Sequence, residues 1–511
     1  MTSTVPDTLI PADVHLSLTF ADCYGRRTEP PMLNLELRTA PNAPLVEQVV
    51  TGVRQHIESR LLRPGARLPS IRTLAANHRI SRFTVVEAYD RLVASGHVES
   101  RRGSGFYVTT PAVPETAVER SGGLERAVDL ANLIAEVVSD DARVAFMGRK
   151  LYAGGCLPND WQEESGIRRH ARQVAASGIE VTDFGTALGY PPLRDYIARR
   201  IGELGIGVPA SQVLLTTGAT QGFDLLIRYL LAPGDAVLVD DPGYYNLFGH
   251  LKLAGVRLLP VPRGSDGPDL AVLAQLAVAH QPKAYFTMSV LNNPTCTNIQ
   301  PAIAHRLLQL AAQHRFNIVE DDIFSDFASN APPRLAALDR LERTFYLGSY
   351  SKTLSSSLRV GFVAASADAI AALTRMKLLV TMTTSAFAER VVHEMLVGGH
   401  FRKHIARIRD RLDARRARVA QELERAGWLL DRMPDSGLFL WARHPDVDDS
   451  VWIAQAALRE SVRLAPGASF RPHHDKSAWM RFNASCVVDP AVFKLLARAG
   501  ALAKAEQRTR R

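Results

Sequence analysis

The stretch GSYSKTLSSSLRVG at residues 348–361 places a single lysine, Lys352, seven residues before an arginine, Arg359. The preceding run Thr344–Gly348 is β-branched and aromatic and predicts a buried strand. Lys352 would then follow a strand end, where α/β sheets bind their ligands. A buried amine beside a fixed cation is pushed toward its neutral form and can form a Schiff base, and the nearby hydroxyls suit a phosphate. The stretch therefore predicts a pyridoxal 5'-phosphate anchor or, in the plainer alternative, a surface lysine after a strand.

Length and composition bound the class of protein. At 511 residues with 46% hydrophobic content, the chain is long enough for two or three domains with large cores. Its four cysteines are scattered without a CxxC pair or metal-ligand spacing, which argues against a disulfide framework and a metal site. No apolar run has membrane-spanning length, and the N-terminus lacks the pattern of a signal peptide. We therefore expect a cytoplasmic protein that binds no membrane.

Residues 44–109 differ from the rest of the chain in charge. They contain ten arginines, no lysine and five acids, about half of the net charge of +9. Apolar spacing over Val46–Ile57 predicts a helix, and Ser70 and Ser81 are placed to cap two more helices around a tight turn. The segment Val98–Val108 predicts a hairpin with a basic tip. Together these elements predict a winged helix-turn-helix, whose second helix enters the major groove of DNA.

The text PGARLPSIRTLAANHRISRFTVVEAYDRLVASGHVESRRGSGFYV in this segment resembles the GntR family of bacterial regulators. The resemblance implies contacts with a double-stranded DNA operator from Arg72, Ser81, Arg82, Phe83, Thr84, Arg102 and Gly103. Arg72 and Arg102 are expected on phosphates, which position the protein, and Arg82 on a guanine edge, which specifies sequence. For Phe83, contact with a thymine methyl group and packing against the wing are both open.

The remaining boundaries follow from composition. Residues 1–43 form an N-terminal extension, 110–144 a linker with some helical content, and 145–511 a large domain. Short apolar runs in the large domain alternate with helical segments, which predicts an α/β sheet covered by helices. These runs are Val213–Gly218, Ala236–Asp241, Val256–Val261, Ala284–Val290, Asn317–Asp322, Thr344–Gly348 and Gly361–Ala365. The arginine-rich helix that begins near Phe401 is expected to present a solvated face rather than to bind nucleic acid.

Other strand ends supply what a pyridoxal phosphate site needs. Gly218–Gln221 opens a helix, whose N–H groups can bind a phosphate. Asp321 can keep the pyridine nitrogen protonated, which strengthens the electron sink. Tyr244 can stack on the ring, and Asn293 can donate to its phenolic oxygen. Arg481 can bind a carboxylate with both arms of its guanidinium.

The large domain resembles the fold-type I aminotransferases over about residues 145–505, and the whole chain resembles the MocR subfamily of GntR regulators. By position, the resemblance implies that Lys352 is the catalytic, Schiff-base lysine and that Arg481 binds the carboxylate of a substrate or effector. It implies cofactor contacts from Lys352, Asp321, Asn293, Tyr244, Ala219, Thr220, Ser349, Ser351 and Arg359. The family fold is a homodimer with each site at the subunit interface, and in some members the domains exchange head to tail.

The chain departs from the family pattern at several positions. Ile323 and Phe184 stand where the family usually has tyrosines, and Phe324 supplies no hydroxyl either. Cys296 replaces a glycine and Ser356 a frequent proline. We expect weaker cofactor binding and hypothesise a DNA-binding regulator that senses pyridoxal phosphate or an amino compound without efficient turnover. The alternatives are an active aminotransferase carrying a DNA-binding head, and a regulator whose large domain only dimerises.

Overall fold

The computed structural model describes the chain in two units, Met1–Arg120 and Ser121–Arg511. The described residues are Leu35, 44–58, 61–62, 65–101, 104–109, 150–151, 154–177, 184–487 and 489–509. The expected linker 110–144 and, apart from Leu35, the expected extension 1–43 lie outside this set.

The first unit is a winged helix-turn-helix, as expected. Its elements are α1 (Leu45–Glu58), α2 (Ile71–His78), α3 (Arg82–Ala94), β1 (Val98–Arg101) and β2 (Gly105–Val108). The Ser70 hydroxyl accepts from the N–H of Thr73 at 3.1 Å and caps α2, and Ser81 caps α3 through the N–H of Thr84 at 3.0 Å. The antiparallel strands β1 and β2 form the hairpin. Both predicted caps are confirmed.

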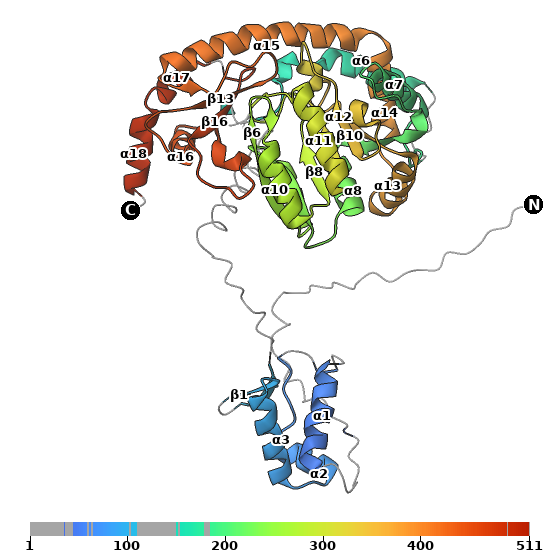
Figure 1. The fold of residues 1–511 in the computed structure, drawn as a ribbon, viewed down its shortest axis with the longest axis vertical. Coiled ribbons are helices and arrows are strands. Elements are labelled where there is room, and N and C mark those ends of the chain that lie inside the picture. Colours follow the sequence, from blue (N-terminus) through green and yellow to red (C-terminus); the bar gives the residue numbers. More distant parts are fainter. Residues whose placement is uncertain are drawn as a thin grey trace, which may run out of the picture. The chain divides into compact units, whose positions relative to one another are not determined.

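An eight-stranded sheet organises the second unit (Figure 1), in the order β4-β11-β10-β9-β8-β5-β6-β7. Its strands are β4 (Val213–Thr217), β5 (Ala236–Asp241), β6 (Arg257–Gly264), β7 (Gly267–Pro268), β8 (Ala284–Thr287), β9 (Asn317–Asp321), β10 (Thr344–Ser349) and β11 (Val360–Ala364). All seven predicted strands are present. The central strands are parallel and covered on both faces, which explains why they are apolar throughout instead of alternating.

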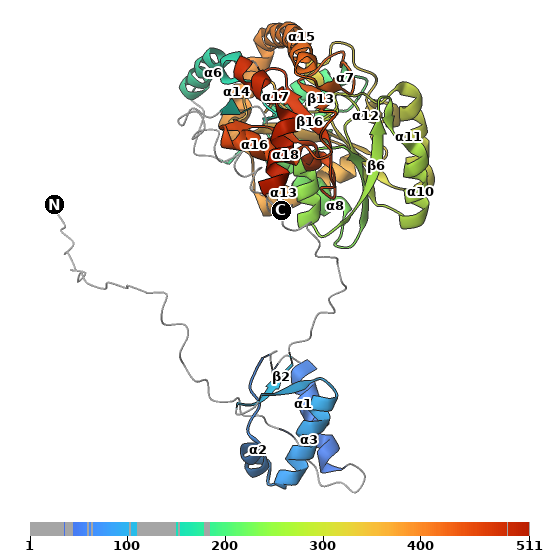
Figure 2. The same ribbon diagram turned by 90° about the vertical axis from the view of Figure 1, so that its left-hand side faces the viewer.

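Helices cover both faces of this sheet. Figures 1 and 2 show α10 and α11 on one face and α8 and α13 on the other. The helical segments are η1 (Asn159–Trp161), α6 (Glu164–Ala176), α7 (Pro191–Gly202), η2 (Ala210–Gln212), α8 (Gly218–Leu230), α9 (Tyr245–Leu253), α10 (Leu270–His280), α11 (Pro301–His314), η3 (Ser325–Phe327), α12 (Leu335–Asp339), α13 (Ala367–Val380), α14 (Ala386–Val397) and α15 (His400–Arg425). One side of the arginine-rich α15 is buried through residues such as Ile405 and Leu412, so this helix packs on the unit as expected.

A second, smaller sheet was not predicted, and two of its four strands are only two residues long. Its order is β12-β13-β16-β15, and β14 pairs with β3 beside it. The elements of this part are β3 (Lys150–Leu151), β12 (Leu429–Leu430), β13 (Phe439–Arg443), α16 (Val451–Arg459), β14 (Val462–Arg463), β15 (Ala465–Pro466), η4 (Gly467–Phe470), β16 (Trp479–Asn483), α17 (Pro490–Leu496) and α18 (Ala499–Thr509). No helix in the described ranges is long and apolar enough to cross a membrane.

Candidate cofactor site and DNA-binding helix

Lys352 follows β10 within one turn, at the carboxyl end of the central strands. Its Nζ lies 3.3 Å from the sulfur of Cys156 and 6.0 Å from the centroid of the Phe324 ring. Burial disfavours the ammonium, but attraction to Cys156 and two nearby tyrosines outweighs burial, so the pKa of Lys352 is raised. The expected lowering is therefore wrong. Arg359 is the cation that sequence spacing places near Lys352, and spacing does not bring the Cys156 thiol to it.

Asp321 ends β9, the parallel neighbour of β10, and is buried. Its Oδ1 accepts from the N–H of Ile323 at 3.2 Å. Its Oδ2 is also buried but has no hydrogen-bond partner among the described residues. Burial raises the pKa of Asp321 to about 7. A protonated pyridine nitrogen would give this oxygen both a donor and a positive charge, so the carboxylate fits the cofactor.

The start of α8 offers a phosphate cradle. No side chain caps this helix end, so its first N–H groups, including those of Ala219 and Thr220, can bind an anion. Arg359 lies across the cradle and donates to the hydroxyls of Ser351 and Thr220, at 3.2 Å each. Gly218 has a φ of +65°, and a Cβ there would lie 2.6 Å from Arg359 Nη2. Only glycine leaves room for the guanidinium here, and the donors suit a phosphate.

The contacts of Ser349 differ from those of Arg359, Ser351 and Thr220. Its hydroxyl donates to the carbonyl oxygen of Val360 at 3.3 Å and accepts from the N–H of Ser351 at 3.1 Å. Both bonds are internal to the turn between β10 and β11. Ser349 therefore shapes the turn that carries Lys352, and its predicted contact with phosphate remains a prediction.

Arg481, in β16, is only 1% exposed. Its guanidinium carbon lies 4.4 Å from the Phe439 ring and 4.8 Å from the Phe470 ring. Its Nη1 donates to the side-chain oxygen of Asn293 at 2.7 Å. This bond turns the Asn293 oxygen toward Arg481 and leaves the amide NH₂ as the donor that the cofactor's phenolic oxygen requires.

Residues 154–156 border both Lys352 and Arg481. A Cβ on Gly155 would lie 4.0 Å from the Lys352 amine and 3.9 Å from a nitrogen of Arg481. Asn483 holds the segment by donating to two of its carbonyl oxygens, at 3.0 and 2.9 Å. This segment has no role among the sequence-based predictions. Its glycine pair was the available signal, because glycine permits close approach of the backbone to a ligand.

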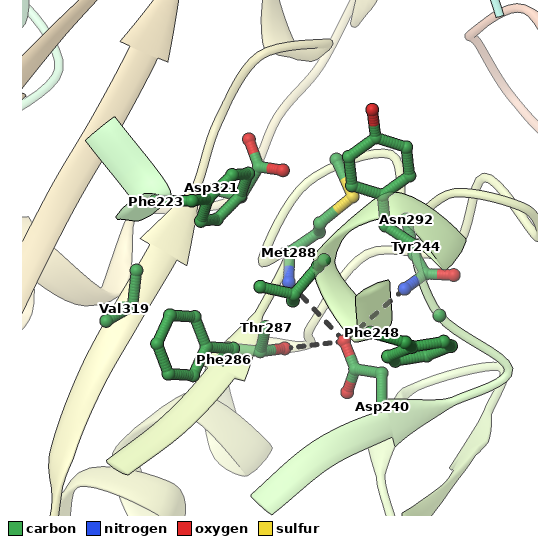
Figure 3. Close-up of a pocket in the computed structure, with 12 residues that line it drawn as sticks. Phe223, Asp240, Tyr244, Phe248, Phe286, Thr287, Met288, Asn292, Val319 and Asp321 are labelled. Atoms are coloured by element: carbon green, nitrogen blue, oxygen red, sulfur yellow. Dashed lines mark hydrogen bonds between the residues drawn. The ribbon is translucent and has the colours of Figure 1, made fainter. Parts of the chain in front are cut away.

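Tyr244 and Asp321 line a small cavity of about 10 Å³ near the predicted ring position (Figure 3). Burial raises the pKa of Tyr244 to about 12. The buried Asp240, which was not identified from the sequence, accepts several hydrogen bonds in this region. Figure 3 shows that its carboxylate accepts from the Thr287 hydroxyl at 2.9 Å and from the Asn292 amide at 3.4 Å. Asp240 thereby holds the loop that carries Asn293.

The positions that depart from the family pattern lie in two environments. Ile323 and Phe324 are buried in the core beneath the site and bring no hydroxyl to it. Phe184 is 76% exposed. Cys296 is buried and has a φ of +55°, the left-handed conformation that glycine adopts most easily.

In the first unit, the predicted DNA-contacting side chains stand at the start of α2 and α3. Arg72, Arg82 and Phe83 are exposed, Phe83 by 76%. The alternative in which Phe83 packs on the wing is therefore wrong for the described part of the wing. Ser81 and Thr84 share a hydrogen bond of 2.8 Å between their hydroxyls. The predicted wing residues Arg102 and Gly103 lie outside the described residues.

Comparisons with known proteins agree with the fold of the first unit and with that of the second. The model for aminotransferase class I and II matches residues 155–499, and that for bacterial regulatory proteins of the gntR family matches residues 45–108. An uncharacterized HTH-type transcriptional regulator, YdcR of Escherichia coli (strain K12), is 30% identical over 86% of this chain and 94% of its own. The probable rhizopine catabolism regulatory protein MocR of Rhizobium meliloti is 28% identical over 83% of this chain and 87% of its own.

Enzymes are also similar to this chain. The 2-aminoadipate transaminase of Thermus thermophilus is 31% identical over 62% of this chain and 81% of its own. The crystal structure of LysN, the α-aminoadipate aminotransferase from Thermus thermophilus, complexed with N-(5'-phosphopyridoxyl)-L-leucine, aligns with a TM-score of 0.65 and 27% identity. That alignment covers 72% of this chain and 95% of LysN.

Proposed function

Because this chain belongs to the aminotransferase class I and II family and joins that region to a GntR-type helix-turn-helix, we propose that it is a transcriptional regulator that senses pyridoxal 5'-phosphate or an amino compound bound to it. The observation that carries the proposal is the buried, unpartnered Oδ2 of Asp321 beside the strand that leads to Lys352. A buried carboxylate oxygen without a hydrogen-bond partner costs free energy of folding unless a cationic donor binds to it.

Each residue of the site has a distinct task. Asp321 holds a proton on the pyridine nitrogen, and Arg359 with the start of α8 binds the phosphate. Arg481 orients the carboxylate of an amino effector, and Tyr244 covers the ring. When bound, pyridoxal phosphate supplies an aldehyde for an amine and a ring that withdraws electrons. Binding of an effector amine there would leave the Lys352 side chain free, and that change in the site could alter the protein's conformation.

The first unit binds operator DNA through the predicted set. Arg82 and Phe83 reach base edges, Thr84 shares the start of α3, and Arg72 binds phosphate. The wing residues Arg102 and Gly103 contact the DNA backbone. The exposure of Arg72, Arg82 and Phe83 in the structure supports the assignment of these three residues.

The working form is a homodimer. Leu379 and Met382, at the end of α13, are 90% and 52% exposed, an apolar surface that a second copy would cover. Gln221 in α8 donates to Thr381 at 2.6 Å, which ties this surface to the phosphate cradle. A two-fold dimer predicts an operator with two related half-sites.

Sensing is favoured over turnover because Ile323 and Phe324 bring no hydroxyl to the cofactor. The second candidate is a working aminotransferase with a DNA-binding head. The 31% identity to a transaminase favours it, as does the retention of Lys352, Asp321 and Arg481.

Absorbance spectroscopy tests the proposal. Full-length protein mixed with pyridoxal phosphate and desalted should keep the visible absorbance of the lysine-bound cofactor. Lys352→Ala should lose it, and Lys403→Ala, at an exposed lysine of α15, should keep it. A colourless wild-type protein would refute cofactor sensing. Steady-state transamination with a panel of amino donors separates the two candidates, since turnover above the Lys352→Ala background would favour the enzyme.

A further inference from the structure

A second cavity of about 580 Å³ opens between α7, α15 and the η3 segment, away from the cofactor residues. Figures 1 and 2 both place α7 beside α15. The cavity has the size of a small-molecule site. Tyr196 and Phe401 give it an apolar wall. Its other walls are charged: five arginines and two acids line it, namely Arg199, Arg200, Arg334, Arg402, Arg409, Glu203 and Asp326.

The charges in this cavity do not cancel. Arg200 pairs with Asp326, and Arg334 pairs at 3.1 Å with Asp322 behind the wall. Of the other three, Arg409 uses its Nε to donate to the Asp326 carbonyl oxygen at 2.8 Å.

Arg199 and Arg402 form no ion pair within the described part of the chain. Glu203 can offset one of the three remaining guanidinium groups, so two positive charges are left facing the cavity. A phosphate monoester carries roughly −2 at neutral pH and offers oxygens that match the guanidinium fork.

The cavity is connected to the cofactor site through η3. Asp326 and Ser325 line the cavity, and Phe324 directly precedes them in the chain. The Phe324 ring lies 6.0 Å from the Lys352 amine and 5.3 Å from the Phe439 ring. An anion that draws Arg200 away from Asp326 would release η3 and shift the ring beside the lysine.

We propose that this arginine-lined cavity is a second ligand site, which binds a phosphorylated small molecule and couples its binding to Lys352 through η3. Two ligands that bias the same element influence each other's affinity, and the coupling is reciprocal.

Calorimetric titration of full-length protein tests the site. The protein is loaded with pyridoxal phosphate and desalted, so that the cofactor's own phosphate cradle is filled, and inorganic pyrophosphate is the probe. The double variant R199E/R402E should bind the probe about tenfold more weakly or worse, because two attractions become repulsions. The matched control R172E/R418E changes two exposed arginines of α6 and α15 that do not line the cavity. It should retain the wild-type affinity.

A second readout follows the coupling. Pyrophosphate should shift the visible absorbance of the bound cofactor in the wild type and the control, and the shift should be lost in R199E/R402E. Absence of pyrophosphate binding, or equal affinity in both double variants, would overturn the proposal. So would a variant that keeps its affinity for pyrophosphate and loses affinity for DNA, because the arginines would then serve DNA phosphates. If the cofactor absorbance itself were missing, the proposed function would fail, while arginine-dependent binding of pyrophosphate would still stand.

Discussion

The unpartnered Oδ2 of Asp321 leads to a prediction about stability in the cofactor-free protein. Burial raises its pKa from an ordinary value of 3.8 to about 7. The folded state therefore keeps a proton that the unfolded state releases, so this group's contribution to stability falls as the pH rises from about 4 to 7. A shift of about 3 units corresponds to roughly 4 kcal/mol lost above pH 7. Asp321→Asn removes the ionisation, and the buried amide still has a desolvation cost. We expect the variant to be more stable than the wild type at pH 8 by about 2–4 kcal/mol.

Urea denaturation of the cofactor-free proteins at pH 5 and pH 8 measures this difference. Glu320, whose pKa burial also raises to about 7, contributes to the pH dependence of both proteins, so the comparison is made between variants at each pH. Asp368→Asn, at an exposed position of α13, is the control and should change little.

Pyridoxal phosphate should reverse the order of stabilities. Its pyridinium pairs with the Asp321 carboxylate, so the cofactor should stabilise the wild type at pH 8 much more than Asp321→Asn. The reasoning is refuted if the variant is no more stable than the wild type at pH 8, or if the cofactor stabilises both equally.

Three further outcomes are expected. Arg82→Ala should cost about 1–3 kcal/mol of operator affinity and relax selectivity at one base position. Arg72→Ala, in contrast, should weaken binding to all sequences and reduce its salt dependence. Gel-shift titrations on operator variants distinguish the two results. Cys156→Ser should lower the pKa of Lys352 by removing the main attraction that raises it, so cofactor binding followed by stopped-flow absorbance should be faster at pH 7. Arg481→Lys should weaken binding of amino-acid effectors about tenfold by replacing the fork with a point charge, with the cofactor absorbance retained as the control.

Local features made much of the fold predictable. The strand runs are recognisable because a parallel strand covered on both faces is apolar throughout. The caps at Ser70 and Ser81 depend on a hydroxyl and an N–H three residues away, so spacing suffices to place them. The small sheet escaped prediction because two-residue strands such as β12 and β15 carry no period.

The sequence by itself determined the family resemblance, the strand ends and the residue types at Lys352, Asp321 and Arg359, since each depends on a short, ordered motif. Tertiary structure alone decided the electrostatics of the site. It placed Cys156 beside Lys352 across 196 positions of sequence and raised the lysine's pKa where spacing had predicted a lower one. It also buried the Asp321 carboxyl group and left its Oδ2 without a hydrogen-bond partner among the described residues. Charge interactions depend on distance and burial, which motifs do not encode.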